Sequence, residues 1–316
     1  MIEARQYVSL PKRPESDQSG MRRTFAIGKF DGLHLGHQAI ILLTVNQARL
    51  TNTVPCLFCF DPHPRFVLTG DARYQSWLTP PKERAQVAKD YGIEETYVAM
   101  FDESFRSQTA REFIEGYLVA LGAKVLIVGN DFHFGKNGAY DVDDVKAIGE
   151  SLGIDVQVVS KVQDEDEPVS SSRVRQYLLH GDVQGARRLL NRPYKLCATV
   201  VHGQHMGRTI GFPTANLAVT EPYVLPCEGV YVVTSVIDEK KVLGVMNIGR
   251  RPTVTNANTL SLEVHFPDLV DANLYEQTLC VEFLEFLREE QTFASLDMLR
   301  QQLTRDVEHA RAVSFT

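Results

Sequence analysis

Two different patterns of secondary structure follow one another along this chain and meet near Pro193. Before Pro193, short apolar stretches rich in β-branched and aromatic residues alternate with stretches of helical periodicity. Such alternation is typical of a parallel α/β sheet with helices on both faces. After Pro193, strand-like stretches follow one another with Gly, Pro and Asn between them, which predicts a small antiparallel β-barrel. The sequence therefore predicts two domains of different architecture.

The expected elements are as follows. In the first part we expect strands over 24–27, 54–60, 96–100, 124–128 and 156–159, and helices over 37–49, 80–91, 109–121 and 142–153. Two short helices follow, one ending near residue 180 and one over 183–190, before the helix-breaking Pro193. In the second part we expect strands over 198–201, 229–236, 243–248, 260–266 and 278–286, and a helix over 295–311. We place the domain boundary between residues 185 and 186, so that the domains span 1–185 and 186–316.

Composition excludes several classes of partner. The 316 residues carry a net charge of −7 and no run of Lys and Arg, so we expect no nucleic-acid and no membrane partner. No stretch approaches the roughly 18 apolar residues of a membrane span, and the first residues lack the apolar core of a signal peptide. Five scattered cysteines, an odd number, fit a reducing compartment better than a disulfide scaffold. We therefore expect a cytoplasmic protein.

The most informative segment of the first domain is Gly28-Lys29-Phe30-Asp31-Gly32-Leu33-His34-Leu35-Gly36-His37. It follows an expected strand and opens an expected helix, where backbone N–H groups and the positive helix end can bind an anion. His34 and His37 are three residues apart and so lie on one helix face. Gly36 lets a phosphate approach the backbone closely. The segment resembles the signature of nucleotidyltransferases that attack the α-phosphate of a nucleoside triphosphate.

A second segment, Ser170-Ser171-Ser172-Arg173-Val174-Arg175, places hydroxyls at an expected helix start and two cations close behind. It resembles the S-S-T-x-x-R motif of the same enzymes, whose Arg meets the triphosphate. Ser172 replaces the Thr and keeps its hydroxyl, and Arg175 stands at the position of the motif's Arg.

Two other motif interpretations fail on spacing. The segment over 129–137 has one residue too many between its glycines for a P-loop, and no Ser or Thr follows its Lys. Cys56, Cys59 and His63 could suggest zinc. However, Cys56 and Cys59 lie three apart in an expected strand, where they face opposite sides.

The most informative segment of the second domain is Gly207-Arg208-Thr209-Ile210-Gly211-Phe212-Pro213-Thr214-Ala215-Asn216. Its glycines permit a tight loop beside phosphates. Thr214 and Asn216 offer two oxygen ligands, which suits Mg²⁺ because this ion takes most of its ligands from phosphates and water. The segment resembles the G-R-x-x-G-F-P-T-A-N motif of riboflavin kinases.

Together, in this order, the two signatures resemble those of bacterial bifunctional riboflavin kinase/FAD synthetases, from about Phe25 to Arg311. The resemblance implies a Rossmann-like nucleotidyltransferase domain that adenylylates FMN to FAD and a β-barrel domain that phosphorylates riboflavin to FMN. ATP is the co-substrate of both reactions and Mg²⁺ the cofactor. Asn191, Cys197 and Glu276 stand where the family pattern has glycine.

The resemblance also implies roles for individual residues. In the kinase, Glu263 of Leu262-Glu263-Val264-His265 accepts the proton of the ribityl hydroxyl, and in the adenylyltransferase His34 and His37 stabilise charge on the phosphates. Phe60-Asp61-Pro62-His63-Pro64 and Val128–Gly135 match segments specific to flavin enzymes. The expected nucleotide-binding residues are Gly28, Phe30, Asp31, His34, Gly36, His37, Asn130, Asp131, Ser171, Ser172, Arg175, Gly207, Arg208, Gly211 and Thr214. The expected flavin-binding residues are His63, Pro64, Phe132 and Phe134. The expected metal ligands are Thr214 and Asn216.

Two alternatives stay open at this point. One is a monofunctional FAD synthetase whose barrel only binds flavin, and the other is a different nucleotidyltransferase, which would have no use for the kinase segment. The sequence leaves the oligomeric state open. The expected small-molecule partners are riboflavin, FMN, FAD and ATP.

Overall fold

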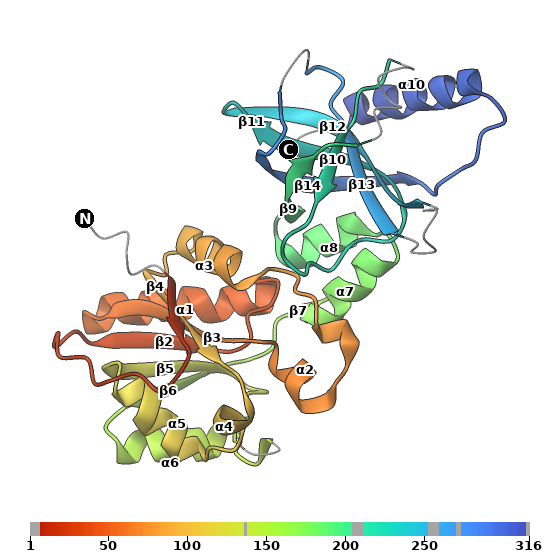
Figure 1. Ribbon diagram of the computed structural model, residues 1–316. Helices are drawn as coiled ribbons and strands as arrows, with labels where there is room; N and C mark the ends of the chain where they lie inside the picture. Colours follow the sequence, from red (N-terminus) through yellow and green to blue (C-terminus); the bar gives the residue numbers. More distant parts are fainter. Residues whose placement is uncertain (1–6, 136–137, 204–210, 252–258, 270–272, 314–316) are drawn as a thin grey trace. The chain divides into compact units, whose positions relative to one another are not determined.

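A computed structural model describes residues 7–135, 138–203, 211–251, 259–269 and 273–313 (Figure 1). Contacts divide the chain into two compact units that meet between Ser171 and Ser172. Gly185 and Ala186, where the sequence places the domain boundary, both lie in one helix, Val183–Leu190. That boundary stays a prediction.

The first unit contains a sheet of six parallel strands within the described residues. Its strands are β1 (Tyr7–Leu10), β2 (Arg23–Ile27), β3 (Val54–Asp61), β4 (Glu95–Met100), β5 (Ala123–Gly129) and β6 (Asp155–Val159). Its helices are α1 (Leu35–Thr51), α2 (Pro64–Thr69), η2 (Ala72–Tyr74), α3 (Pro81–Asp90), α4 (Glu103–Arg106), α5 (Ala110–Phe113), η3 (Ile114–Val119) and α6 (Val142–Ser151), and a small ribbon, β7 (Gln163–Asp164) and β8 (Glu167–Pro168), follows. The predicted α/β sheet is confirmed.

The strand order of this sheet is β1-β4-β3-β2-β5-β6, so the chain reverses its direction of travel at β2. In parallel sheets of this kind, ligands bind beyond the carboxyl ends of the strands beside such a switch point. The loops after β2 and β5, which carry the predicted segments 28–37 and 128–135, leave the sheet there. The topology therefore brings two segments about 100 residues apart to one edge.

Alternate residues of the central strands enter two separate cores. Cys56 and Phe58 of β3 lie in the core under α5, η3 and α6, whereas Leu57 and Cys59 lie in the core under α1 and α3. The two cysteines thus face opposite sides of the sheet, as the spacing predicts. In the described part of the chain no group of three or more His, Cys, Asp or Glu residues is arranged to hold a metal ion.

The second unit begins at the second residue of α7 (Ser171–Leu179), includes α8 (Val183–Leu190), and continues as a closed antiparallel barrel. The barrel strands are β9 (Tyr194–Val201), β10 (Ala215–Ala218), β11 (Gly229–Ile237), β12 (Lys240–Arg251), β13 (Thr259–His265) and β14 (Thr278–Arg288), and the last helix is α10 (Leu296–Ala312). Their order around the barrel is β10-β13-β12-β11-β14-β9, with β9 pairing back to β10. The predicted barrel is confirmed.

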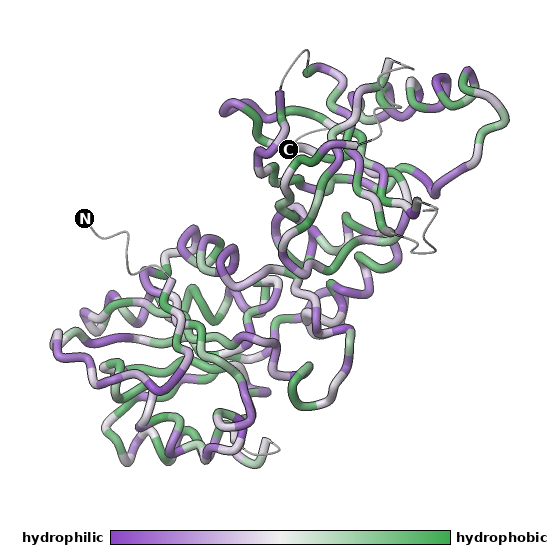
Figure 2. Tube along the Cα trace, viewed as in Figure 1, coloured by the Kyte–Doolittle hydropathy of each residue, from purple (hydrophilic) through white to green (hydrophobic). Residues whose placement is uncertain are grey.

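Helix α10 covers one outer face of the barrel. Val307 and Ala310 pack with Val230, Val232 and Val245 in one buried cluster. Figure 2 shows α10 alternating between hydrophilic and hydrophobic colour along its turns, as expected of a helix that buries one face. Among the described residues, no helix combines the length and the apolar composition that crossing a membrane requires.

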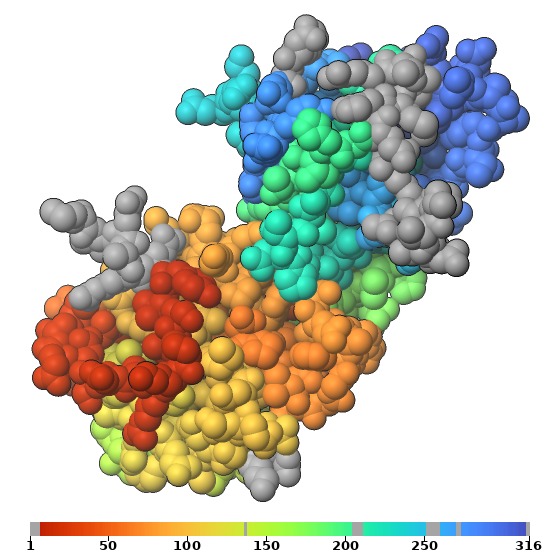
Figure 3. Space-filling view, viewed as in Figure 1, coloured from red at the N-terminus to blue at the C-terminus, as the bar shows by residue number. Residues whose placement is uncertain are grey.

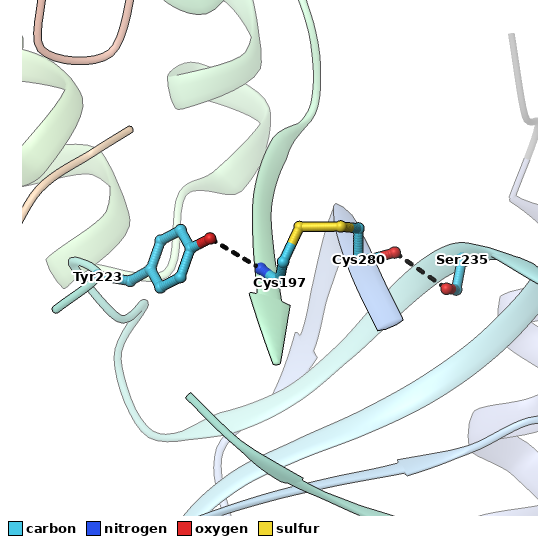
Figure 4. The surroundings of a disulfide bond; sticks show 4 residues. All are labelled: Cys197, Tyr223, Ser235 and Cys280. Carbon is cyan, nitrogen blue, oxygen red and sulfur yellow. Dashed lines mark hydrogen bonds between the residues drawn. A yellow bond between two sulfur atoms is a disulfide. The ribbon is translucent and has the colours of Figure 1, made fainter. Parts of the chain in front are cut away.

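The sequence led us to expect that the cysteines fit a reducing compartment better than a disulfide scaffold, and for two of them this expectation is wrong. Cys197 and Cys280 form a disulfide between β9 and β14 (Figure 4). The two residues are direct partners in the antiparallel register, with Cα atoms 4.0 Å apart. Their separation of 83 residues hid this proximity, because only the closure of the barrel brings its first and last strands together. Cys56, Cys59 and Cys227 are free thiols.

We expect reduction of this disulfide to lower the melting temperature of the barrel by about 10 °C. A disulfide that closes a long loop restricts the unfolded chain and typically adds about 2–4 kcal/mol to the free energy of unfolding. Each kcal/mol shifts the melting temperature of a domain of this size by a few degrees. Thermal melts with and without dithiothreitol measure the shift. Cys280→Ser should abolish the response and Cys227→Ser should retain it. Titration of five thiols in oxidised, denatured protein would contradict the assignment.

Candidate active sites

The loop between β2 and α1 turns unusually tightly. Phe30, Gly32 and Leu33 have positive φ angles of 51°, 88° and 45°, which glycine adopts readily and which are uncommon for Phe and Leu. The Leu33 N–H donates to the Phe30 carbonyl oxygen at 3.3 Å. His34 then occupies the N-cap of α1, whose first turn carries no acidic side chain. The positive end of a 17-residue helix is therefore not neutralised by its own first turn.

His34 and His37 lie together at this helix start. Their rings are stacked with centroids 3.7 Å apart and planes 19° apart, and the Phe30 ring lies 5.1 Å from His37. His34 is buried and His37 half-buried. A Cβ at Gly36 would come within 3.2 Å of the His34 ring, so a side chain there would displace the imidazole. Glycine at this position thus serves the histidine pair as well as the backbone.

Asp31 ties this loop to two other segments. Its side chain is fully buried, and Oδ1 accepts from the Leu78 N–H at 2.8 Å and from the Thr79 N–H at 3.2 Å. The Ser171 hydroxyl donates to the Asp31 carbonyl oxygen at 2.8 Å. The structure therefore brings together four of the predicted nucleotide-binding residues, namely Asp31, Ser171, His34 and His37.

Ser172 and Arg175 lie on α7, on the other side of the division between the units. Ser172 is exposed at the start of the helix, and Arg175 is buried one turn later. Their contact with a triphosphate stays a prediction.

The segment after β5 contributes polar and aromatic side chains of different exposure. Asn130 and Asp131 are exposed, and Asp131 pairs with Lys161 at 3.2 Å. Phe134 is buried and stacks on Phe113 of the core at 4.2 Å, whereas Phe132 is half-buried. Phe132 therefore offers more ring surface to a ligand than Phe134 does. The predicted nucleotide and flavin contacts of this segment stay predictions.

His63 and Pro64 begin α2 directly after β3. Both are buried, and His63 is the N-cap, with Nδ1 accepting from the Arg65 N–H at 3.0 Å. The His63 ring contacts those of Tyr74 and Trp77, with centroids 4.8 and 5.1 Å away. The sequence pattern singled out neither aromatic residue, because they lie in a stretch without helical or strand periodicity.

In the barrel, Glu263 of β13 is the centre of a polar cluster. The Thr214 hydroxyl donates to its Oε2 at 3.2 Å, and the Ser261 hydroxyl donates to its Oε1 at 3.2 Å. Asn216 of β10 and Asn247 of β12 are its direct register partners on the two neighbouring strands. Side chains of directly paired residues lie on one face of a sheet, so both amides flank the carboxylate.

Thr214 and Asn216 supply the donor chemistry that Mg²⁺ prefers. A hydroxyl and an amide oxygen are hard ligands, and they stand beside the Glu263 carboxylate. Gly211 has a positive φ of 83°, which fits the predicted tight loop. The predicted Gly207 and Arg208 lie outside the described residues.

His265 and Glu290 make further hydrogen bonds near Glu263. His265 Nδ1 lies 2.8 Å from the Pro213 carbonyl oxygen, and because a carbonyl only accepts, Nδ1 carries the proton. Burial lowers the pKa of His265, which favours the neutral ring. Glu290, which the sequence pattern did not single out, accepts from the Asn247 amide at 2.8 Å. It follows the last barrel strand and is near the site only in three dimensions.

Two protein-family models match this chain, one over each of the two candidate sites. The model described as FAD synthetase matches residues 16–173, and the model described as riboflavin kinase matches residues 190–314. The first range contains the histidine pair, and the second contains Glu263.

Several curated proteins are similar over nearly the whole chain. Proteins named bifunctional riboflavin kinase/FMN adenylyltransferase from Pseudomonas fluorescens, Escherichia coli K12 and Listeria monocytogenes are 38%, 37% and 33% identical over 289, 287 and 292 residues. The alignments cover 91%, 90% and 92% of this chain and 92%, 90% and 92% of those proteins. A crystal structure described as a macrolide-efflux protein from Streptococcus pneumoniae matches with a TM-score of 0.90 and 31% identity, covering 98% of this chain and 99% of that one. The chain belongs to the family of bifunctional riboflavin kinase/FMN adenylyltransferases.

Proposed function

We propose that this enzyme phosphorylates riboflavin in its barrel and adenylylates the resulting FMN in its α/β domain, with ATP as the co-substrate of both reactions. The observation that carries the proposal is the presence of two separate sites in one chain. One is the stacked His34–His37 pair at the start of α1, and the other is the Glu263 carboxylate beside Thr214 and Asn216.

In the kinase reaction, Glu263 accepts the proton of the terminal ribityl hydroxyl as its oxygen attacks the γ-phosphorus of ATP and ADP leaves. The hydrogen bonds from Thr214 and Ser261 orient the carboxylate for this step. Thr214 and Asn216 would hold Mg²⁺, which neutralises charge on the phosphates when bound.

In the adenylyltransferase reaction, a phosphate oxygen of FMN attacks the α-phosphorus of ATP, the bond to the bridging oxygen breaks, and pyrophosphate leaves. His34 and His37 donate hydrogen bonds to the phosphates, and the N–H groups at the start of α1 add the positive helix end. The His63 segment and Phe132 bind the flavin. We also propose a cytoplasmic location and no nucleic-acid or membrane partner, on the basis of the net charge of −7 and the lack of a run of Lys and Arg and not of the cysteines.

Incubation of the purified chain with riboflavin, ATP and Mg²⁺, followed by chromatographic separation of the flavins, tests the proposal. We expect FMN to form first and FAD to accumulate as FMN is consumed, and we expect EDTA to stop both steps. FAD formation from added FMN, but no FMN formation from riboflavin, would instead support the alternative of a flavin-binding barrel without kinase activity.

A further inference from the structure

A chain of five contacting planar side chains surrounds the residues that follow β3. His63 contacts the rings of Tyr74 and Trp77, and each of these carries an arginine over its face. The Arg65 guanidinium lies 4.9 Å from the Tyr74 centroid, and the Arg84 guanidinium lies 4.5 Å from the Trp77 centroid. We call these five residues the His63 stack. They come from the excursion between β3 and α3, drawn in orange in Figures 1 and 3, and from α3 itself.

The Arg84 end of the stack is fully buried. Its side chain has no exposed surface, and Nη2 donates to the Thr79 carbonyl oxygen at 3.3 Å. Among the described residues, no carboxylate lies within ion-pair distance of Arg84, and its Nε and Nη1 have no hydrogen-bond partner. Burying a cation is costly without compensation, and contact with an aromatic face is worth most where water is excluded. The Trp77 indole is therefore one of the groups that compensate this guanidinium, together with the Thr79 carbonyl oxygen and the Cys59 thiol, whose pKa burial raises and the guanidinium charge lowers.

Arg84 also lies close to the end of β3. Burial raises the pKa of the Asp61 carboxyl, and the charge of Arg84 opposes this rise. Asp61 is the last residue of β3 and directly precedes Pro62 and His63. The Arg84 charge thus acts on the same segment that the stack contacts.

The segment that follows Trp77 is attached to the phosphate-binding loop. Leu78 and Thr79 donate their N–H groups to Asp31, three residues before His34. Trp77 therefore contacts His63 with its side chain, while the next two residues hold the loop of the histidine pair. One short stretch of chain connects the two segments that the adenylyltransferase site needs.

We propose that Trp77 and Arg84 are positioning residues for the adenylyltransferase, which hold the FMN-binding segment 61–64 in place relative to the loop of His34 and His37. Neither residue contacts the reacting atoms in this proposal. The inference rests on the proposed function, because it takes His63 and its neighbours as part of the FMN site. Arg84 fixes the indole, the indole fixes the imidazole, and the hydrogen bond from the Arg65 N–H to His63 Nδ1 completes the orientation.

Steady-state kinetics of the full chain test this role. Arg84→Met keeps the length of the side chain and removes its cation. It should raise the KM for FMN about 10-fold with kcat changed less than about 2-fold, the pattern of lost binding that is equal in ground and transition states. Arg84→Lys keeps a cation over the indole and should restore part of the affinity. Riboflavin phosphorylation should be unchanged in both variants.

Arg73→Met is the matched control. Arg73 lies in the same excursion, but its side chain is 68% exposed and pairs with Asp71. It has no part in the His63 stack. Its KM for FMN should equal that of the unmodified chain.

The fluorescence of the protein gives a second readout, because Trp77 is the one tryptophan of the sequence. It is 4% exposed, so its emission should be blue-shifted and poorly quenched by acrylamide. Arg84→Met should shift the emission to longer wavelength and increase the quenching. Trp77→Phe keeps an aromatic face and should raise the KM for FMN less than Trp77→Leu. This pair of variants decides the question if Arg84→Met does not fold.

The outcomes separate this inference from the function on which it rests. An unchanged KM and unchanged emission in Arg84→Met, or equal KM values in Trp77→Phe and Trp77→Leu, overturn the positioning role. A rise in KM of the same size in Arg73→Met also overturns it. A wild-type chain that makes no FAD from FMN overturns the proposed function instead, and the emission of Arg84→Met then still tests the contact. A 10-fold rise in KM for Arg84→Met, partly restored by lysine and accompanied by the emission shift, supports the proposal.

Discussion

Glu263→Gln should reduce FMN formation from riboflavin by about 10²–10⁴-fold while leaving ATP binding intact, since this is the range for removing a general base. Glutamine keeps the shape of the side chain and can still accept one of the two hydrogen bonds that Thr214 and Ser261 donate to the carboxylate at 3.2 Å, because it retains one acceptor oxygen. It cannot take up the ribityl proton. The measurement is single-turnover FMN formation at saturating ATP and Mg²⁺, followed by chromatography.

Two controls accompany this variant. FAD formation from FMN depends on the other site and should proceed at the wild-type rate in the same preparation. Glu282→Gln removes a carboxylate that also accepts from a threonine hydroxyl, that of Thr234 at 3.3 Å. Glu282 lies on β14, which pairs with β9 and β11 and not with β13. The Glu282→Gln variant should therefore phosphorylate riboflavin at the wild-type rate. Unimpaired turnover in Glu263→Gln would reject the assignment of the base and favour a mechanism that needs no side chain for deprotonation.

The sequence predicted those strands and helices whose pattern of apolar residues matches their burial in the folded protein. The central strands of the sheet are short apolar runs, and they occur where expected because both of their faces are buried. β10 was missed, because Ala215–Ala218 contains no β-branched or aromatic residue. It is a strand because it pairs with both β9 and β13, and this pairing depends on closure of the whole barrel.

Three positions where the family pattern has glycine also show what the sequence can and cannot predict. At two of them the backbone conformation is kept, and at the third the residue is explained only by a partner distant in sequence. Asn191 and Glu276 replace glycine, yet both have positive φ angles, 54° and 66°. The backbone conformation is therefore kept although the residue has changed, and asparagine is among the residues that tolerate it best. Cys197 could not be explained from its own neighbourhood, since its partner Cys280 is 83 residues away.

The candidate sites were predictable to the extent that they lie in short continuous segments. The histidine pair and the Thr214–Asn216 pair each lie within three or four residues, and their proposed roles follow from the resemblance of these short segments to the family signatures. Trp77, Arg84 and Glu290 act through contacts between segments distant in sequence. No local pattern distinguishes them from ordinary core or surface residues, so only the folded structure identifies them.

The second large effect is expected at the start of α1. His34→Ala or His37→Ala should lower conversion of FMN to FAD by at least ~10²-fold, which is the scale for removing one donor to transition-state charge. Riboflavin phosphorylation should barely change in either variant. His180→Ala, which removes an exposed histidine at the end of α7, is the control and should leave both reactions unaffected.

The stacking of the two rings makes a further distinction testable. With centroids 3.7 Å apart, His34 and His37 support each other's orientation, so removal of one ring should disturb the other. Residues that act as a unit show strongly non-additive losses. The double variant should therefore lose little more activity than the worse of the two single variants. Independent donors would instead give the product of the two single losses, at least ~10⁴-fold if each removes ~10²-fold. Near-normal adenylylation in either single variant would show that the triphosphate does not bind at this helix start.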